Sequence, residues 1–151
     1  MRVHERAPIM ERVTLALALA LLAGGCSRPA GPAPIALGTA CATCGMEVQD
    51  LKFACERAAA GSWRVYDSIE CLLSDPEVRS AEGVFLADYD RRALHRADSL
   101  WVVRGEFASP MGGGLAAFLD LPAADSIAAA TRGRVDRLTA FFAAARSEPR
   151  R

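Results

Sequence analysis

Residues 53–73 read Phe-Ala-Cys-Glu-Arg-Ala-Ala-Ala-Gly-Ser-Trp-Arg-Val-Tyr-Asp-Ser-Ile-Glu-Cys-Leu-Leu, and this stretch predicts the repeating unit of the fold. Short runs on either side of its glycine indicate strands at 53–58 and 63–66. Ser68 is well suited to cap the helix that the apolar spacing after it predicts. A third strand is predicted at 84–89, which gives the order strand, strand, helix, strand.

The same order repeats in the second half of the chain. Its predicted elements are a strand at 100–104, a glycine-rich turn at 110–114, a strand at 115–119, a helix at 123–131, a short strand or helix start at 135–138, and a helix at 139–146. One unit of this size buries too little apolar surface to be stable alone. The sequence therefore predicts an α+β fold, in which two small ββαβ units, about 46–90 and 98–146, pack together with antiparallel sheets.

The composition favours one small globular domain over 39–146. The chain has 151 residues, of which 18 are basic and 18 acidic, so its formal charge of +0 offers no electrostatic footprint for nucleic acid. Aromatic residues make up 7%, which predicts a small and largely aliphatic core. No Ser-His-Asp set, Cys-His pair or pair of carboxylates occurs at a spacing typical of catalysis, so we do not expect an enzyme.

The first residues carry an export pattern. An apolar run at 13–23 follows basic residues and is 11 residues long, whereas a membrane span needs about 20. Leu-Ala-Gly-Gly-Cys at 22–26 then resembles a bacterial lipobox. We therefore predict a lipoprotein signal peptide over 1–25, with Cys26 lipidated; the alternative is an ordinary signal peptide with an incidental cysteine. Translation can begin at either of the first two methionines.

A proline-rich stretch separates this signal from the predicted domain. Residues 26–38 contain Ser-Arg-Pro-Ala-Gly-Pro-Ala-Pro without a hydrophobic period, which predicts a flexible, lipidated tether. Residues 147–151 are polar and are predicted to be a disordered tail. These features predict a protein of the cell envelope, anchored to a membrane and facing the periplasm; Ser27 leaves sorting to an outer membrane open.

The soft metal ligands gather in the segment Cys41-Ala-Thr-Cys44-Gly45-Met46. Two cysteines three residues apart can bind one metal ion through both sulfurs or form a disulfide. Gly45 lets the backbone turn sharply enough for Met46 to approach the same point. A thioether is a poor ligand for zinc and a good one for copper(I), so this segment favours copper(I).

Other interpretations of the cysteines remain open. In an oxidising compartment Cys41 and Cys44 can form a structural disulfide, which the residues alone support as well as they support a metal site. A redox Cys-x-x-Cys is less favoured, because no helix is predicted directly after Cys44. A zinc site that also uses Cys55 and Cys71 is opposed by the spacing of those two residues, and we expect both in the core or bonded to each other.

Two further residues bear on the same site. Met111 lies on the glycine-rich turn and would meet Cys44 and Met46 if the two units pack face to face; the alternative is that it fills a gap between the units. His95 stands among arginines, which is typical of a solvated surface residue rather than of a ligand.

The ordered set of these segments resembles the NosL family of copper-binding lipoproteins, which assist the maturation of nitrous-oxide reductase. The set comprises the lipobox, Cys-x-x-Cys-Gly-Met, Tyr66-Asp-Ser-Ile-Glu-Cys-Leu-Leu, Ala87-Asp-Tyr-Asp and Met111-Gly, in that order. The resemblance implies tandem ββαβ units. It also implies a metal site of Cys44, Met46 and Met111, with Cys41 as an optional fourth ligand.

The function that the resemblance implies is that of a periplasmic copper(I) chaperone. Such a protein passes copper by ligand exchange toward nitrous-oxide reductase or another copper enzyme, with a copper-linked membrane transporter as a second partner. Two hypotheses from other classes compete with it: a thiol–disulfide oxidoreductase that uses Cys41 and Cys44, and a metal-free interaction module of the envelope. Cys55 and the glycines after Pro110 depart from what the family leads us to expect.

Overall fold

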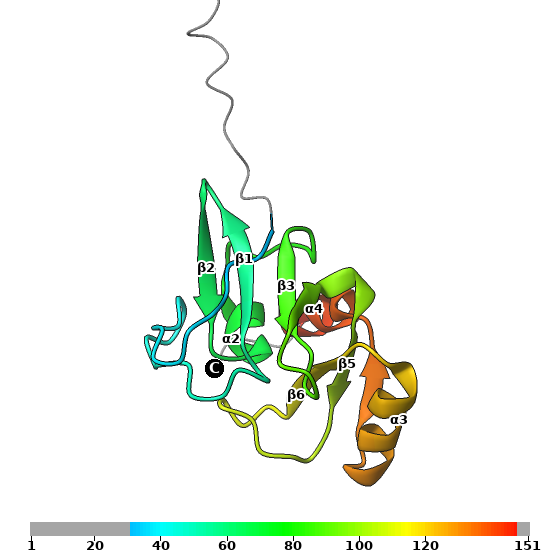
Figure 1. Ribbon diagram of the computed structural model, residues 1–151. Helices are drawn as coiled ribbons and strands as arrows, with labels where there is room; N and C mark the ends of the chain where they lie inside the picture. The colour runs from blue at the N-terminus through cyan, green and yellow to red at the C-terminus, as the bar shows by residue number, and fades with distance from the viewer. Residues whose placement is uncertain (1–30, 148–151) are drawn as a thin grey trace, which may run out of the picture.

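Two antiparallel sheets, each accompanied by helices, make up the structure, a computed structural model that describes residues 31–147 (Figure 1). The predicted signal peptide at 1–25 and the lipidated Cys26 lie outside the described residues, and so do residues 148–151 of the predicted tail. In the part of the chain that is described, no helix is both long and apolar enough to cross a membrane.

The first sheet has the strand order β2-β1-β3-β4 and is antiparallel throughout. Its unit consists of β1 at Cys55–Ala59, β2 at Ser62–Tyr66, α2 at Ile69–Ser74, β3 at Val84–Ala87 and β4 at Leu94–Arg96. The hairpin of β1 and β2 turns at Gly61, whose φ of 83° other residues rarely adopt. Ser68 caps α2 as predicted, because its side-chain oxygen accepts a hydrogen bond from the backbone N–H of Cys71 at 3.3 Å.

The second sheet has the order β6-β5-β7 and repeats the succession of elements in the first. Its unit consists of β5 at Trp101–Arg104, β6 at Leu115–Phe118, α3 at Leu121–Ala130, β7 at Arg134–Asp136 and the terminal helix α4 at Leu138–Ser147. Residues 135–138, predicted as a strand or a helix start, contain both the end of β7 and the first residue of α4. The predicted α+β fold of two ββαβ units with antiparallel sheets is therefore confirmed.

One hydrophobic core joins the two units. It contains Tyr66 and Leu72 from the first unit and Leu115 and Phe141 from the second, and none of these is more than 2% exposed. The terminal helix α4 packs against α2, so the last element of the chain covers the first unit. A smaller cluster around Phe118 fills the space between the second sheet and α3. The shared interface that two undersized units require is present.

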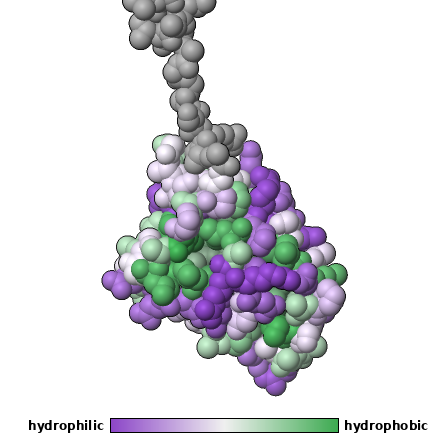
Figure 2. Space-filling model, in the orientation of Figure 1, coloured by the Kyte–Doolittle hydropathy of each residue, from purple (hydrophilic) through white to green (hydrophobic). Residues whose placement is uncertain are grey.

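The start of the described chain lies against the first sheet. The backbone N–H of Ala33 donates a hydrogen bond at 2.9 Å to Oε1 of Glu56, a fully buried residue of β1. Residues 32–35 also line a mostly apolar pocket of about 410 Å³ together with Leu51 and Leu94, and Figure 2 shows apolar residues gathered on this face. This part of the segment predicted as a flexible tether thus packs on the domain, while residues 26–30 lie outside the described residues.

Candidate metal centre

Residues 41–46 form a tight, closed loop ahead of the first sheet. The backbone N–H of Cys41 donates to the carbonyl oxygen of Met46 at 2.7 Å, and the N–H of Gly45 donates to the carbonyl oxygen of Cys41 at 3.0 Å. Gly45 has a φ of 76°, a left-handed conformation that glycine adopts without steric strain. The sharp turn predicted at this glycine is present.

Two hydrogen bonds fasten this loop to the first unit. The N–H of Ala42 donates to the carbonyl oxygen of Val65 in β2 at 2.8 Å. The hydroxyl of Thr43 donates to the carbonyl oxygen of Cys71 in α2 at 2.9 Å. Because both donors lie between the two cysteines of the loop, the backbone that carries those cysteines is held against the strand and the helix at once.

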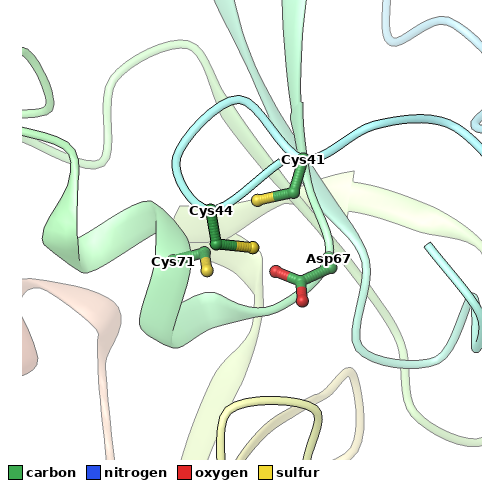
Figure 3. A group of neighbouring side chains, drawn as sticks. All are labelled: Cys41, Cys44, Asp67 and Cys71. Carbon is green, nitrogen blue, oxygen red and sulfur yellow. The ribbon is translucent and has the colours of Figure 1, made fainter. Parts of the chain in front are cut away.

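Four side chains come together where the loop meets β2 and α2 (Figure 3). They are Cys41, Cys44, Asp67 and Cys71, and one potential ligand atom of each lies within 4.8 Å of the others. Asp67 follows the last residue of β2, and Cys71 lies in the first turn of α2. Three of the four residues are buried, whereas Cys44 is exposed. The cluster is therefore mostly buried and is accessible at Cys44.

The three sulfur donors of this cluster fit a soft cation. The thiols of Cys41, Cys44 and Cys71 are free, and Oδ1 of Asp67 is buried with no hydrogen-bond partner among the described residues. A buried polar atom without a partner costs about 1–3 kcal/mol. Such an atom beside three sulfurs indicates a position that faces a positively charged ligand, because the ligand would restore the missing interaction.

Burial determines the protonation of two of these thiols. It raises the pKa of Cys71 far above its usual range, and hydrogen bonds with Asp67 and Cys44 raise it further. Burial also raises the pKa of Cys41, against the opposing effect of hydrogen bonds with backbone groups. Both thiols are protonated at neutral pH in the metal-free protein. A metal ion that binds here must displace their protons, since the thiolate is the ligand.

The two methionines predicted as ligands lie at the surface. Met46 is 47% exposed at the end of the loop that carries Cys44, and Met111 is 44% exposed on the turn between β5 and β6. Of the four predicted ligands, the structure brings the sulfurs of Cys41 and Cys44 into one cluster and leaves both thioethers open to solvent.

The other two cysteines have different surroundings. Cys55 lies in the core, where its thiol donates a hydrogen bond to the carbonyl oxygen of Ser68 at 3.3 Å. It belongs to no metal-ligand cluster found among residues 31–147, so the four-cysteine zinc arrangement does not form there. Cys71 is 2% exposed, as expected for the apolar side of a helix, yet its sulfur is part of the cluster. Cys71 therefore lies in the core, as predicted, and is also a candidate metal ligand, which the sequence did not indicate.

Cys71 and Asp67 are the site residues that sequence reasoning missed. Both belong to Tyr66-Asp67-Ser68-Ile69-Glu70-Cys71, where a strand ends and a capped helix begins. The end of a strand and the first turn of the following helix lie close together, so two metal-ligating side chains at this junction were the available signal. The spacing between cysteines alone gives no indication of a carboxylate in that position.

His95 also differs from its prediction. It is half-buried on the edge strand β4, opposite Leu86 of β3, rather than solvated among its arginine neighbours. Its Nε2 is buried with no hydrogen-bond partner among the described residues, and it lies outside the cysteine cluster.

Comparison with known proteins shows a likeness to a solved structure. No protein-family model and no curated protein matches the sequence. Among solved structures, the fold is similar to the crystal structure of the copper chaperone NosL from Shewanella denitrificans, with a TM-score of 0.61 and 19% sequence identity. The match covers 72% of this chain and 93% of that chain. At this identity the likeness concerns the fold, which both proteins share over nearly the whole folded part.

Proposed function

We propose that this protein is a copper(I)-binding chaperone of the cell envelope, which receives and passes on copper by ligand exchange. The observation that supports this most strongly is the cluster of three free thiols and a buried carboxylate, of which only Cys44 is exposed. Two exposed thioethers, those of Met46 and Met111, add soft donors at the surface. The fold shared with a copper chaperone is consistent with this role.

The choice of copper(I) over zinc follows from the ligand types. Thiolates and thioethers together favour copper(I), while zinc disfavours the thioether. Three cysteines and an aspartate are a ligand set that zinc also accepts, so the choice rests on the two methionines. Here Cys44 is exposed, so one side of the cluster is open to a ligand from another protein.

The cargo would pass between proteins in steps of ligand exchange. The buried thiols of Cys41 and Cys71 lose their protons as copper(I) binds, and they hold the ion from inside the fold. A thiolate, thioether or imidazole of the recipient enters from the exposed side and shares the metal with Cys44 before the protein's own ligands leave. The oxidation state of copper does not change in this sequence, so no electron donor is needed and the protein acts as a carrier.

A thiol–disulfide oxidoreductase is a weaker alternative for the same cysteines. A reactive cysteine of this class has a lowered pKa, usually at a helix N-terminus. Cys41 has a raised pKa instead, and residues 47–50 after the loop form no helix. Three sulfurs in one cluster would nevertheless allow thiol chemistry, and a disulfide-exchange assay separates the two functions. Rapid exchange that persists in Met46→Ala would favour the oxidoreductase.

Competition for copper(I) between the reduced protein and a coloured copper(I) chelator tests the proposal. The double variant Cys44→Ser, Met46→Ala is expected to lose affinity by about 100-fold or more, since removing direct ligands exceeds the about 10–100-fold effect of changes outside the first ligands. Cys71→Ser is expected to weaken binding too. Cys55→Ala is the matched control, because it removes a buried thiol outside the cluster. Unchanged affinity in the double variant would contradict the copper site.

The recipient and the location are further parts of the proposal. The order of motifs resembles the NosL family, which supports nitrous-oxide reductase as the recipient, a copper-linked membrane transporter as the donor, and a lipid anchor at Cys26 facing the periplasm. Incubation of the copper-loaded protein with copper-free nitrous-oxide reductase measures delivery directly. Transfer to a different copper enzyme, but not to this one, would replace the recipient and leave the copper function standing.

A further inference from the structure

The loop between β5 and β6, which carries Met111, is held by a carboxylate from the other unit. Oε1 of Glu70 accepts a hydrogen bond from the hydroxyl of Ser109 at 2.6 Å and a second from the backbone N–H of Leu115 at 3.3 Å. Ser109 Oγ in turn accepts a hydrogen bond from the N–H of Gly114 at 2.9 Å. Glu70 lies in the first turn of α2, directly before Cys71. One side chain therefore links the helix that carries Cys71 to the middle of the loop at Ser109 and to its end at Leu115.

The glycines of this loop are required for that contact. A Cβ on Gly113 would lie 2.7 Å from Cγ of Glu70 and 2.9 Å from its Oε1, so only glycine lets the carboxylate approach. Gly114 has a φ of 65°, and a Cβ there would lie 1.9 Å from the carbonyl oxygen of Gly105 on the opposite side of the loop. The glycines at 113 and 114 thus have a structural role at this interface.

Ser109 also begins the turn that presents Met111. The N–H of Gly112 donates to the carbonyl oxygen of Ser109 at 3.0 Å, which places Pro110 and Met111 at the two central positions of the turn. Ser109, whose hydroxyl donates a hydrogen bond to Glu70, is therefore the first residue of the Met111 turn.

The carboxylate of Glu70 is only half satisfied. Its Oε2 is buried and has no hydrogen-bond partner among the described residues, although Oε1 accepts two hydrogen bonds. An unpaired buried oxygen does not favour stability, so a requirement other than stability is the better explanation for an acid at this position.

We propose that Glu70 and Ser109 are positioning residues that fix the Met111 turn on the helix that carries Cys71, so that the turn is ordered before copper(I) arrives. This inference rests on the proposed copper function. We call these hydrogen bonds of Glu70 with Ser109 and Leu115 the clamp. Without the clamp, the glycine-rich loop would lose its conformational freedom only when the metal binds, and the free-energy cost of ordering the loop would weaken metal binding. With the clamp, the loop becomes ordered when the protein folds.

Glu70→Ala and Ser109→Ala test the clamp in the full chain. In the metal-free protein, labelled at the methionine methyl groups, the Met111 methyl signal is expected to move toward its value in an unfolded chain, while the Met46 signal stays in place. Copper(I) affinity measured against a chelator is expected to fall about tenfold, the size of effect expected from ordering one long side chain and its turn. Glu70→Gln keeps an oxygen acceptor and is expected to restore both measurements. Asp125→Asn, on an exposed face of α3, is the control.

The double variant Glu70→Ala, Met111→Leu separates positioning from general destabilisation. If the clamp acts through Met111, Glu70→Ala causes no further loss of copper(I) affinity once Met111 is replaced. An unmoved Met111 methyl signal in Glu70→Ala, or an equal loss of affinity with and without Met111, would overturn the inference. A wild-type protein that binds no copper(I) would instead refute the proposed function, and the methyl signals of the metal-free protein would still report on the clamp.

Discussion

Cys71 lies on the buried side of α2 and also contributes a sulfur to the candidate metal centre. Its apolar neighbours in the helix predict burial, and burial alone is what a core cysteine requires. The difference comes from Thr43, whose hydroxyl donates to the carbonyl oxygen of Cys71 and brings the Cys41–Cys44 loop over the first turn of the helix. Cys71 can therefore belong to both the core and the candidate metal centre, because the loop places the thiols of Cys41 and Cys44 next to its sulfur.

Asp75 is a second residue whose setting leads to a measurable property. Oδ2 of Asp75 accepts a hydrogen bond from the hydroxyl of Tyr66 at 2.6 Å, and Arg57 and Arg64 form ion pairs with the same carboxylate at 3.6 and 3.3 Å. Burial acts to raise the pKa of Asp75, but the hydrogen bonds and the two arginines outweigh it and hold the pKa below the usual value of 3.8. The folded state thus favours the charged form.

A lowered folded-state pKa makes stability depend on pH in one direction. The stabilisation from Asp75 is fully present above its pKa in the unfolded chain, and it is lost as the pH falls through the lower pKa of the folded state. Asp75→Asn is expected to lower the free energy of unfolding at pH 7 by about 1–3 kcal/mol and to flatten the loss of stability on acidification. Urea denaturation at pH 7 and at pH values below 4 measures both.

Glu77→Gln is the matched control for the Asp75→Asn variant. Glu77 forms ion pairs with the same two arginines, but its side chain is 65% exposed, so the change in unfolding free energy is expected to stay within about 1 kcal/mol. An Asp75→Asn variant that retains the full acid-dependent loss of stability would argue against this origin of the pH dependence.

At the scale of secondary-structure elements, α2 is short and depends on its cap. The helix has 6 residues, from Ile69 to Ser74, and the side chain of Ser68 accepts the hydrogen bond from Cys71 N–H. Because the same helix carries Cys71 and Glu70, its first turn connects the metal cluster with the Met111 loop. Fraying of this turn would disturb both.

Ser68→Ala is therefore expected to affect stability and metal binding together. Loss of an N-cap hydrogen bond costs about 1 kcal/mol, and Ser68 is fully buried. Chemical denaturation measures the loss, and the chelator competition is expected to show weaker copper(I) binding in the same variant. Ser74→Ala, at the exposed end of the helix, is the comparison and is expected to change stability by less than about 0.5 kcal/mol. Normal copper(I) affinity in Ser68→Ala would mean that the cap does not support the site.

The described strand that the sequence did not predict is β4. Its residues, Leu94–Arg96, lie in a charged stretch that shows no strand alternation. The strand forms because β3 offers a free edge, and His95 pairs with Leu86 there. Tertiary context overrides weak local preference in such edge strands.

At the scale of the whole molecule, the two units share a core and are expected to unfold together. Each sheet holds one tryptophan, Trp63 in β2 and Trp101 in β5, so the variants Trp63→Phe and Trp101→Phe each leave a single reporter. Denaturation curves from the two reporters are expected to have the same midpoint, as in a two-state transition. Well-separated midpoints would show that the units are independent.

Phe141 tests the same coupling through the shared core. It is 2% exposed on α4 and belongs to the cluster that contains Tyr66 and Leu72 of the first unit. Phe141→Ala is expected to cost about 3–5 kcal/mol and to lower both tryptophan midpoints equally. Ala143→Ser, on the exposed side of α4, is the control, with an expected change within about 0.5 kcal/mol. A shift confined to Trp101 would contradict the shared core.

The sequence by itself determined the local structure of this protein. The strand pair around Gly61, the cap at Ser68 and the turn at Gly45 depend on side-chain spacing and on backbone preferences within a few residues, and each is present as predicted. The same local pattern identified Cys41 and Cys44 as neighbouring sulfurs. The proposed lipid anchor at Cys26 remains a prediction from sequence, since it lies outside the described residues.

Only the tertiary structure decided which distant residues complete the candidate site. Asp67 and Cys71 join the loop cysteines because hydrogen bonds from Ala42 and Thr43 bring the loop onto β2 and α2. Glu70 meets Ser109 across 39 positions of sequence because the two units share one core. Neither contact leaves a periodic trace in the chain, since each depends on how whole elements pack. Packing of the loop onto β2 and α2, which the Cys-x-x-Cys spacing does not encode, therefore sets the composition of the candidate metal centre.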